Sequence, residues 1–392
     1  MIEVDLDRDV EIRGAVRVER TPRGLLPRRL TEEGFRRLPD RFMRASVGQS
    51  AGIRLALRTD ATRLRLRVNA MKMVEDETAP LPRAWYDVTV DGEVVASAAS
   101  EVGARFLFSF DRPVEGVVPG PDDELEFRLP DAGERELELW LPYSDEVELL
   151  GLWADRPVRA PAPSTRLRWL HHGSSISHGY AASRTTTTWP VVAANLLGLD
   201  LTSLGFSGNA LLDQLTARTI RDTPADLISV KLGINVVNGD HMRRRVFHSA
   251  VHGFLDTIRD GHPTTALLVI SPVCCPPVES LPGPTVFEEG REPPWVTTAG
   301  RHDELAAGKL SLGVIREELA AIVAARQGED PHLGYLDGSS LYAPDDAARL
   351  PMPDNLHPDD AVSALIASRF AELVRWPDGG GDLADRRPAT RT

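Results

Sequence analysis

Four short segments of this 392-residue chain combine small, hydroxyl, amide, carboxylate and imidazole groups in patterns that could do chemistry. They are Gly173-Ser174-Ser175, Gly205-Phe206-Ser207-Gly208, Leu232-Gly233-Ile234-Asn235 and Asp354-Asn355-Leu356-His357. Together they supply a hydroxyl nucleophile, a base with a carboxylate beside it, and donors for an oxyanion. These are the components of nucleophilic acyl transfer.

The last segment places an acid and a base three residues apart. Asp354 and His357 can meet within one turn of backbone, so that the carboxylate binds one imidazole nitrogen. That contact would set the tautomer, leave the other nitrogen free to accept the proton of Ser175, and stabilise the imidazolium that forms. Pro358 follows directly, and we expect its restricted φ to stiffen the base at the start of a helix.

Each segment taken singly also has a purely structural explanation. A serine in 173–175 could cap the next helix, and 205–208 could be a turn that requires positive φ. Asn235 could be a turn residue, and His357 could simply precede a helix. All four segments, however, fall at the same edge of one predicted sheet, where parallel α/β proteins place their sites. Their common position favours the chemical explanation.

The elements that would position these segments alternate between strands and helices. Strands are predicted at 168–171, 199–204, 225–232, 265–271 and 332–336, and helices at 188–197, 241–259, 303–326 and 358–375. The most apolar of the strands suit a parallel sheet that helices cover on both faces. This predicts an α/β domain over 165–378. The tail, 379–392, is low in apolar residues and is predicted to be disordered.

The first 160 residues have a different periodicity. Apolar residues alternate with polar ones in short runs, for example at 53–58, 64–68, 125–129 and 137–141, which is typical of antiparallel strands with one buried face. Asp91-Gly92 between two such runs predicts a two-residue hairpin turn. We therefore expect an antiparallel, jelly-roll-like β-sandwich over 1–160, followed by a proline-rich linker at 156–164.

Three roles are open for this β-sandwich. It could bind carbohydrate, form a wall of the active site, or hold a homodimer together. Exposed aromatic rings would favour sugar binding, but Trp140 and Trp153 lie in alternating runs and are predicted to belong to the core.

Composition excludes several classes of partner and site. The chain carries 45 basic and 58 acidic residues, a net charge of −13, which argues against nucleic acid and anionic membrane surfaces. No apolar stretch reaches the roughly 18 residues of a membrane span, and the charged N-terminus lacks the apolar region of a signal peptide, so we expect a cytoplasmic protein. No phosphate-binding glycine motif is present, and no cofactor or metal is expected. His248 and His252 are interpreted as a solvated helix face rather than a metal pair.

Other residues lie near the predicted pocket. The adjacent Cys274 and Cys275 are expected to be thiols and have no base beside them in the sequence. His171, His172 and His178 surround the nucleophile segment and could tune its polarity or be structural. The long connection from 272 to 300 contains seven prolines and is predicted to form a stiff flap over the acyl or acceptor pocket.

The segments GSSISHG, LGFSGN and DNLHP, in this order, resemble the conserved blocks of the SGNH (GDSL) hydrolase superfamily. They are most similar to its two-domain branch, in which a β-sandwich precedes the SGNH domain, and Trp85-Tyr86-Asp87-Val88 is similar to a motif of that first domain. The resemblance covers about residues 10 to 375. It implies a flavodoxin-like three-layer α/β/α domain with five parallel strands.

The resemblance also implies roles for single residues. Ser175 matches the nucleophile, His357 the base and Asp354 the acid. The oxyanion hole would be formed by Ser175, Gly208 and Asn235. The chain departs from the usual pattern at Ser174, Ser203 and Val236, and the last departure bears on the role of Asn235.

The predicted function is that of a serine esterase or deacylase which acts on a small-molecule or sugar acyl ester through an acyl-enzyme. An alternative is an acyltransferase that moves an acyl group from a thioester to a hydroxyl of a natural product. A third hypothesis is a non-catalytic binding protein, which the complete set Ser175, His357 and Asp354 argues against.

Overall fold

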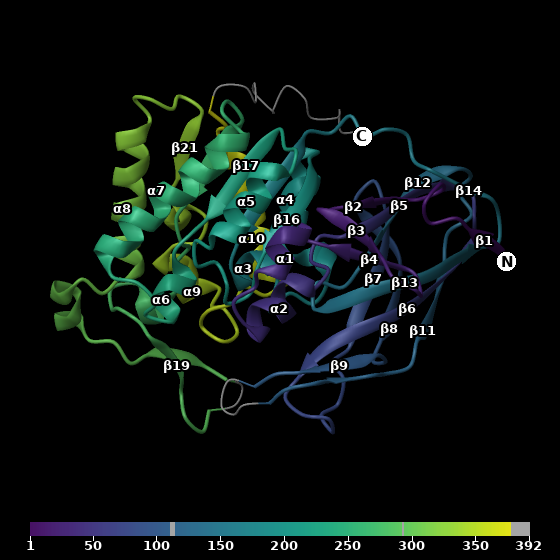
Figure 1. The fold of residues 1–392 in the computed structure, drawn as a ribbon, viewed down its shortest axis with the longest axis horizontal. Helices are drawn as coiled ribbons and strands as arrows, with labels where there is room; N and C mark the ends of the chain where they lie inside the picture. Colours follow the sequence, from purple (N-terminus) through teal and green to yellow (C-terminus); the bar gives the residue numbers. More distant parts are fainter. Residues whose placement is uncertain (110–113, 292–293, 378–392) are drawn as a thin grey trace. The chain divides into compact units, whose positions relative to one another are not determined.

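The computed structural model describes residues 1–109, 114–291 and 294–377, and these form two compact units (Figure 1). Unit 1 comprises Met1–Thr165 together with Arg184–Thr186, and unit 2 comprises Arg166–Ser183 and the chain from Thr187 onward. The predicted tail at 379–392 lies outside the described residues. No helix within the described ranges is long and apolar enough to cross a membrane.

Unit 1 contains two sheets. In the larger sheet the strand order is β10-β9-β6-β13-β4-β3, with β1 paired to β13 and β11 to β6. Its strands are β1 (Ile2–Val4), β3 (Arg17–Arg20), β4 (Leu25–Arg28), β6 (Arg63–Val74), β9 (Ala104–Leu107), β10 (Val117–Val118), β11 (Asp123–Arg128) and β13 (Asp145–Ala154). All its pairs are antiparallel except β6 with β9, which is parallel.

The smaller sheet of unit 1 has the order β14-β5-β12-β7-β8, with β2 paired to β5. Its strands are β2 (Glu11–Arg13), β5 (Arg54–Thr59), β7 (Ala84–Val90), β8 (Glu93–Ser100), β12 (Arg135–Trp140) and β14 (Val158–Arg159). Every pair in it is antiparallel, which confirms the predicted antiparallel β-sandwich. Strand β14 lies inside the predicted linker, so that part of the linker prediction was wrong.

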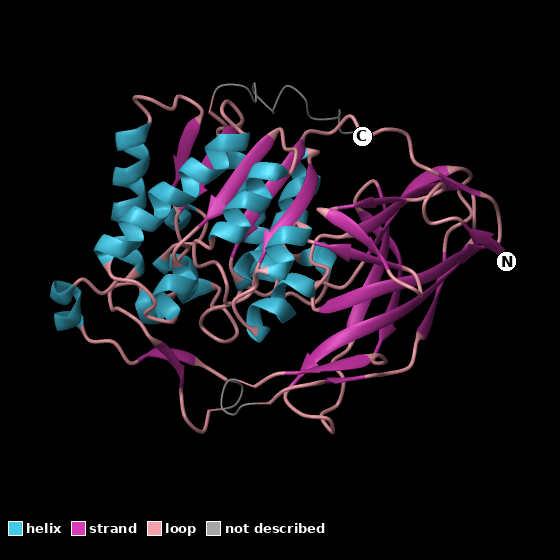
Figure 2. Cartoon of the chain, in the orientation of Figure 1, coloured by secondary structure: helices cyan, strands magenta, loops and turns pink. Residues whose placement is uncertain are grey.

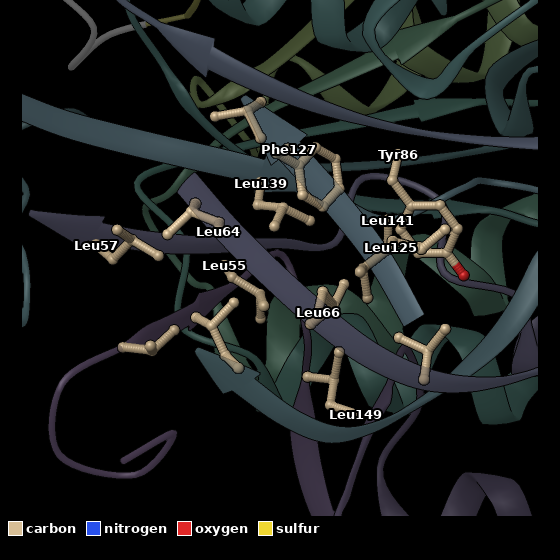
Figure 3. Packing of buried hydrophobic residues seen from close by; sticks show 14 of the residues in the cluster. Leu55, Leu57, Leu64, Leu66, Tyr86, Leu125, Phe127, Leu139, Leu141 and Leu149 are labelled. Atoms are coloured by element: carbon tan, nitrogen blue, oxygen red, sulfur yellow. The ribbon is translucent and has the colours of Figure 1, made fainter. Parts of the chain in front are cut away.

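The alternating sequence builds the core between these sheets. Along β6, Leu64 and Leu66 are buried whereas Arg63 and Arg67 are exposed, as a period of two requires. Leucines from six strands meet Tyr86 and Phe127 in one apolar cluster, part of which is drawn in Figure 3. The burial of so many leucine side chains is the main stabilising contribution in this unit.

The predicted hairpin turn is confirmed. Asp91 and Gly92 have φ of 50° and 83°, so both central residues adopt the positive φ that a tight hairpin needs, and β7 pairs with β8 across them. Trp140 is buried as predicted, but Trp153 is only partly buried and the Arg65 guanidinium lies over its ring. The core prediction for Trp153 was therefore wrong.

Two short helices in unit 1 were not predicted. They are α1 (Glu32–Arg36) and α2 (Arg41–Gly48). Each begins at a side chain that accepts a hydrogen bond from the first turn: Thr31 caps α1, and the Asp40 carboxylate accepts the Met43 N–H at 2.8 Å. Helices of this length span too few turns to produce a clear apolar periodicity.

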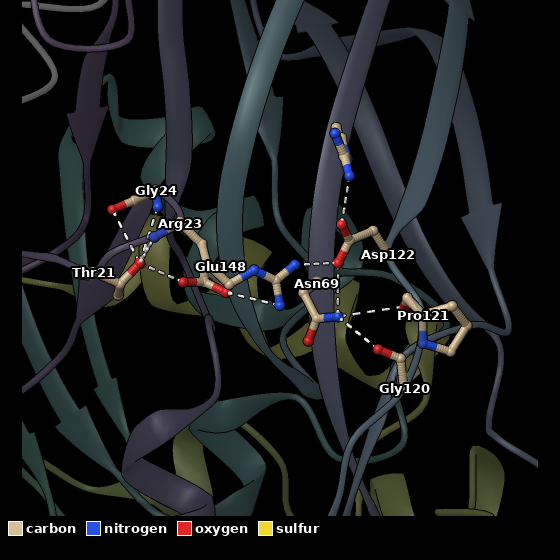
Figure 4. A network of polar contacts seen from close by, with 9 residues as sticks. Thr21, Arg23, Gly24, Asn69, Gly120, Pro121, Asp122 and Glu148 are labelled. Atoms are coloured by element: carbon tan, nitrogen blue, oxygen red, sulfur yellow. Dashed lines mark hydrogen bonds and ion pairs between the residues drawn. The ribbon is translucent and has the colours of Figure 1, made fainter.

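A polar network joins the β3–β4 turn to neighbouring strands (Figure 4). The Thr21 hydroxyl donates to Glu148 at 2.5 Å, and its oxygen accepts the Gly24 N–H at 2.9 Å. Asp122 accepts hydrogen bonds from Arg23, Arg67 and Asn69. Burial raises the pKa of Asp122, but these donors outweigh it and hold the pKa below its ordinary value.

A fully buried ion pair in unit 1 allows a stability prediction. The Lys72 ammonium lies 2.5 Å from the Asp145 carboxylate, and neither side chain is exposed. We expect Lys72→Met to lower the free energy of unfolding by about 3–5 kcal/mol, because it leaves a buried carboxylate without its partner. The double variant Lys72→Met with Asp145→Leu should recover most of that loss in calorimetry of the full chain. A double variant no more stable than the single one would contradict this explanation.

Unit 2 contains a five-stranded parallel sheet with the order β16-β15-β17-β18-β21. These strands are β15 (Arg168–Gly173), β16 (Asp200–Gly205), β17 (Leu227–Lys231), β18 (Ala266–Ile270) and β21 (Leu333–Leu336). Helices flank the sheet (Figure 2): α4 (Trp189–Leu197) packs with α10 (Asp360–Leu373), and α5 (Gln214–Asp222) packs with α7 (Arg244–Gly261). This is the predicted flavodoxin-like α/β architecture.

Unit 2 contains one further long helix, α8 (Leu312–Arg326), and several shorter elements. The shorter elements are α3 (Ser175–His178), α6 (Ile234–Asn238), α9 (Pro344–Arg349), the hairpin β19 (Thr285–Phe287) with β20 (Val296–Thr298), and four 3-10 turns, η1 (Thr185–Thr187, at the boundary between the units), η2 (Pro276–Val278), η3 (His302–Ala307) and η4 (Gly338–Ser340).

Several predicted helix boundaries were wrong by two or more residues, and in two cases a capping residue is the reason. The helix predicted at 303–326 is broken, because the chain turns at Gly308 and Ser311 then caps α8 by accepting the Val314 N–H. The last helix begins at Asp360 rather than at Pro358, because the Asp359 carboxylate accepts the Val362 N–H at 2.9 Å and acts as its cap.

Candidate active site

Ser175 lies where strand β15 ends and the short helix α3 begins. The hydroxyl of Ser174 caps α3 by accepting the Ile176 N–H at 3.3 Å, which leaves Ser175 as the first helical residue. The structural explanation, a helix cap, therefore applies to Ser174, and the chemical explanation applies to its neighbour Ser175. The Ser175 side chain keeps a small exposed surface, since the residue is 7% exposed.

The structure brings Ser175, His357 and Asp354 together. The Oγ atom of Ser175 lies 2.8 Å from Nε2 of His357, although 182 residues separate them in the chain. On the other side of the imidazole, Nδ1 lies 2.6 Å from Oδ2 of Asp354. An ionised carboxylate can only accept, so Nδ1 carries the proton and Nε2 is left to accept the serine proton.

Asp354 is held by the backbone of its own loop. Its Oδ1 atom accepts the N–H groups of His357 at 2.7 Å and Leu356 at 3.0 Å. Burial raises the pKa of Asp354, but the hydrogen bonds and charge of His357 outweigh burial and keep the pKa below its ordinary value. The carboxylate is therefore ionised at neutral pH, as an orienting acid must be.

The sequence predicts that Ser175, Gly208 and Asn235 form an oxyanion hole, and the structure shows which of their donors are available. The backbone N–H groups of Ser175 and Gly208 donate to no acceptor within the described parts of the chain. Gly208 has φ of 70°, which favours glycine at the turn after β16. The side-chain Oδ1 atom of Asn235 accepts the Ala210 N–H at 3.0 Å, which fixes the orientation of the side chain and leaves its N–H₂ group to donate.

Three buried histidines form hydrogen bonds beside the segments that follow β15 and β16. His171 binds Ser229 Oγ through Nδ1 at 2.7 Å and Ser177 Oγ through Nε2 at 2.8 Å, and so connects the sheet to α3. The Ser207 N–H donates to Nδ1 of His178 at 3.2 Å, next to Gly208. His172 donates from Nδ1 to the Leu204 carbonyl at 2.8 Å. These contacts favour a structural role for all three histidines.

The buried histidines make the stability of unit 2 sensitive to acid. Burial lowers the pKa of His172 to about 4 and that of His171 well below its ordinary value. Below a pH of about 6.5 these two histidines therefore bind protons in the unfolded chain that they do not bind in the folded chain, so their contribution to stability is constant above this pH and falls as the pH decreases. Each histidine contributes a slope of up to about 1.4 kcal/mol per pH unit.

Replacing one histidine tests this slope. We expect His172→Asn, which keeps a donor for the Leu204 carbonyl, to reduce the loss of stability between pH 6.5 and 5 by up to about 1.4 kcal/mol per pH unit. Calorimetry at several pH values measures it. An unchanged slope would show that His172 is protonated in the fold.

The two cysteines are buried thiols. Burial, assisted by Glu279, raises the pKa of Cys274 to about 12, and burial also raises the pKa of Cys275. The Cys275 thiol donates to the Asn355 carbonyl at 3.5 Å and so lies under the loop that holds His357. Neither thiol has the thiolate character that a nucleophile needs near neutral pH.

His248 and His252 engage polar partners on helices. Nδ1 of His248 lies 3.1 Å from Glu318, and Arg326 donates to His252 at 3.0 Å. Within the described residues there is no cluster of three or more potential metal ligands.

The connection from 272 to 300 is tied to the loop that carries His357. The Val296 N–H donates to the Asp354 carbonyl at 2.9 Å, and the Asn355 amide donates to the Val296 carbonyl at 3.0 Å. The connection includes the hairpin β19–β20, which the sequence did not predict. Its role as a flap over the pocket stays a prediction.

Comparison with known proteins identifies a family for the part of the chain that carries these residues. The GDSL-like lipase/acylhydrolase family matches residues 172–365, a range that contains Ser175, Gly208, Asn235, Asp354 and His357. Residues 172–365 form a GDSL-like lipase/acylhydrolase domain. This domain makes the protein an enzyme of the SGNH hydrolase and acyltransferase type. No protein of curated function matches the sequence.

The similarity to solved structures extends beyond the GDSL-like domain and covers the N-terminal unit of the chain as well. A salicylyl-acyltransferase from a tetracycline biosynthetic pathway is 28% identical, with a TM-score of 0.74 and 92% of each chain covered. A GDSL-like lipase from Bacteroides ovatus is 17% identical (TM-score 0.64; 94% of this chain and 95% of that chain). A family two carbohydrate esterase from Cellvibrio japonicus is 14% identical (TM-score 0.57; 95% of each chain). The last two similarities concern the fold alone.

Proposed function

We propose that this GDSL-like enzyme transfers an acyl group from a small-molecule ester or thioester to a hydroxyl acceptor through an acyl-serine at Ser175. The observation that carries the covalent chemistry is the pair of short contacts of His357, 2.8 Å to the Ser175 hydroxyl and 2.6 Å to the Asp354 carboxylate. A base that contacts a hydroxyl on one side and a carboxylate on the other is arranged to take up a proton from that hydroxyl.

In the first half-reaction, Ser175 Oγ attacks the acyl carbonyl carbon while its proton moves to Nε2 of His357. The negative charge that develops on the carbonyl oxygen is stabilised by the N–H groups of Ser175 and Gly208 and by the amide of Asn235. One such donor is worth about 3 kcal/mol. The leaving alcohol or thiol then departs with the proton from Nε2, and the acyl group stays on Ser175.

In the second half-reaction, His357 removes a proton from the acceptor hydroxyl as its oxygen attacks the acyl-serine. Collapse of the second tetrahedral intermediate returns the proton to Ser175 Oγ and releases the new ester. The similarity to a salicylyl-acyltransferase, at 28% identity over 92% of both chains, favours an alcohol as the acceptor.

Hydrolysis is the second candidate function, because water can replace the alcohol with no change in the first half-reaction. The esterases among the similar structures share the fold. In this case the enzyme is an esterase or deacylase, and the partition of the acyl-enzyme between water and alcohol decides between the two functions.

An acceptor experiment distinguishes them. The enzyme is supplied with the acetyl thioester of N-acetylcysteamine and increasing concentrations of an alcohol, and the free thiol, acetate and new ester are measured. Transfer predicts that the new ester replaces acetate as the alcohol concentration rises and that Ser175→Ala forms neither product. Acetate as the sole product with every alcohol tested would support hydrolysis and contradict transfer.

A further inference from the structure

Tyr180 presents a large aromatic side chain beside His357. Its ring centroid lies 4.5 Å from the imidazole centroid, with the two planes inclined by 43°. The residue is nevertheless 58% exposed. An aromatic ring contributes most to stability or binding when other groups bury it. An exposed ring in contact with the proposed catalytic base is therefore a candidate surface for binding substrate.

The turn that ends the nucleophile helix places this ring. Gly179, with φ of 106°, terminates α3 in the left-handed conformation. The N–H groups of Gly179 and Tyr180 both donate to the Ser175 carbonyl, at 2.9 and 3.1 Å. Tyr180 is therefore connected through its backbone to the nucleophile itself.

The segment after Tyr180 is fastened next to His357 as well. Asp360, at the start of α10, accepts the N–H and the hydroxyl of Ser183 at 2.8 and 2.5 Å and the hydroxyl of Thr187 at 2.7 Å. Because Asp360 lies three residues after His357, these bonds hold the loop against the helix that follows the base. The backbone that carries the ring is thus held at both ends of a short loop.

The side of the site that Tyr180 occupies follows from the chemistry. The carbonyl oxygen of the substrate must face Gly208 and Asn235, whereas the leaving oxygen and the incoming acceptor oxygen must both reach Nε2 of His357. The group attached to either oxygen must therefore approach the imidazole of His357, and the Tyr180 ring lies against that imidazole.

We propose that Tyr180 is a specificity-determining residue which binds the flat apolar face of a ring on the leaving group or acceptor, and that the preferred class is an aromatic alcohol. This inference rests on the proposed acyl-serine function. The hydroxyl to be acylated would then be carried by a planar ring system rather than by a flexible chain.

Matched acetate esters test this proposal. The value of kcat/KM is measured for benzyl, cyclohexylmethyl and ethyl acetate and for an acetylated methyl glucoside. The enzymes compared are the wild type, Tyr180→Ala, Tyr180→Phe and the control Leu196→Ala, which removes an exposed apolar side chain from α4. Benzyl and ethyl acetate share the acyl group, so the ratio of their kcat/KM values measures the effect of the aromatic ring on the leaving group.

We expect Tyr180→Ala to lower the benzyl-to-ethyl ratio by about three- to tenfold, mainly through KM, and to affect the other two esters less. Tyr180→Phe should restore the ratio, and Leu196→Ala should leave it unchanged.

An unchanged benzyl-to-ethyl ratio, or an equal loss for all four esters, would overturn the proposal while the acyl-serine function stands. A loss that is greatest for the glucoside would overturn the aromatic class. Failure of the wild type to turn over any of these esters or the acetyl thioester of N-acetylcysteamine, with or without an alcohol, would overturn the proposed function itself, and the inference with it.

Discussion

Ser175→Ala is expected to lower kcat for p-nitrophenyl acetate by roughly 10⁵- to 10⁶-fold and to remove the burst of p-nitrophenol. The variant keeps the proposed oxyanion donors of Gly208 and Asn235 but lacks the proposed nucleophile, and enzymes with such an arrangement lose most of their rate when one catalytic group is removed. Pre-steady-state absorbance measurements follow both quantities.

The neighbouring serine provides the matched control. Ser174→Ala removes the cap of α3, which accepts the Ile176 N–H, and is expected to cost about 1 kcal/mol of stability while kcat stays within about tenfold of the wild type. If Ser175→Ala retained a burst, or if Ser174→Ala caused the larger loss, Ser175 could not be the nucleophile.

Asp354→Asn is expected to lower kcat by about 10⁴-fold. The asparagine amide can donate to Nδ1 of His357, which would move the imidazole proton to Nε2. That nitrogen lies 2.8 Å from the Ser175 hydroxyl and would then be unable to accept its proton.

Asp359→Asn is a suitable control for this change, because Asp359 caps α10 two residues after His357. Asparagine is as good a cap as aspartate, so the control should retain near wild-type kcat. Steady-state kinetics at pH 7.5 measures both variants. A loss below about tenfold in Asp354→Asn would mean that the carboxylate does not orient the base.

The fold could be predicted to a large extent because its periodicities are long and distinct. Strand β6 alternates over twelve residues, and the five strands of the parallel sheet are separated by segments long enough for a crossover helix. Elements that depend on a single cap were missed, among them α1 and α2, and the break before α8 comes from Gly308 and Ser311 rather than from any change in hydropathy.

The candidate site could be anticipated where chemistry and topology coincide. Ser175 follows a strand of the parallel sheet, and the segment 354–357 precedes the last helix that packs on it. Both were therefore expected at the edge where the carboxyl ends of the strands lie, and so close to each other. The catalytic roles of these residues stay predictions. Tyr180 could not be found in this way, because its position depends on the turn at Gly179 and on hydrogen bonds from Ser183 to Asp360.

The central claim is that turnover passes through an acyl group on Ser175. Rapid quenching of the reaction with p-nitrophenyl acetate, followed by mass spectrometry of the intact protein and its peptides, tests this claim most directly. The predicted result is the added mass of one acetyl group on the peptide that contains Ser175, absent from Ser175→Ala and lost on addition of an acceptor alcohol. Turnover with no acetylated protein, or with the acetyl group on Cys274 or Cys275, would contradict the proposed mechanism.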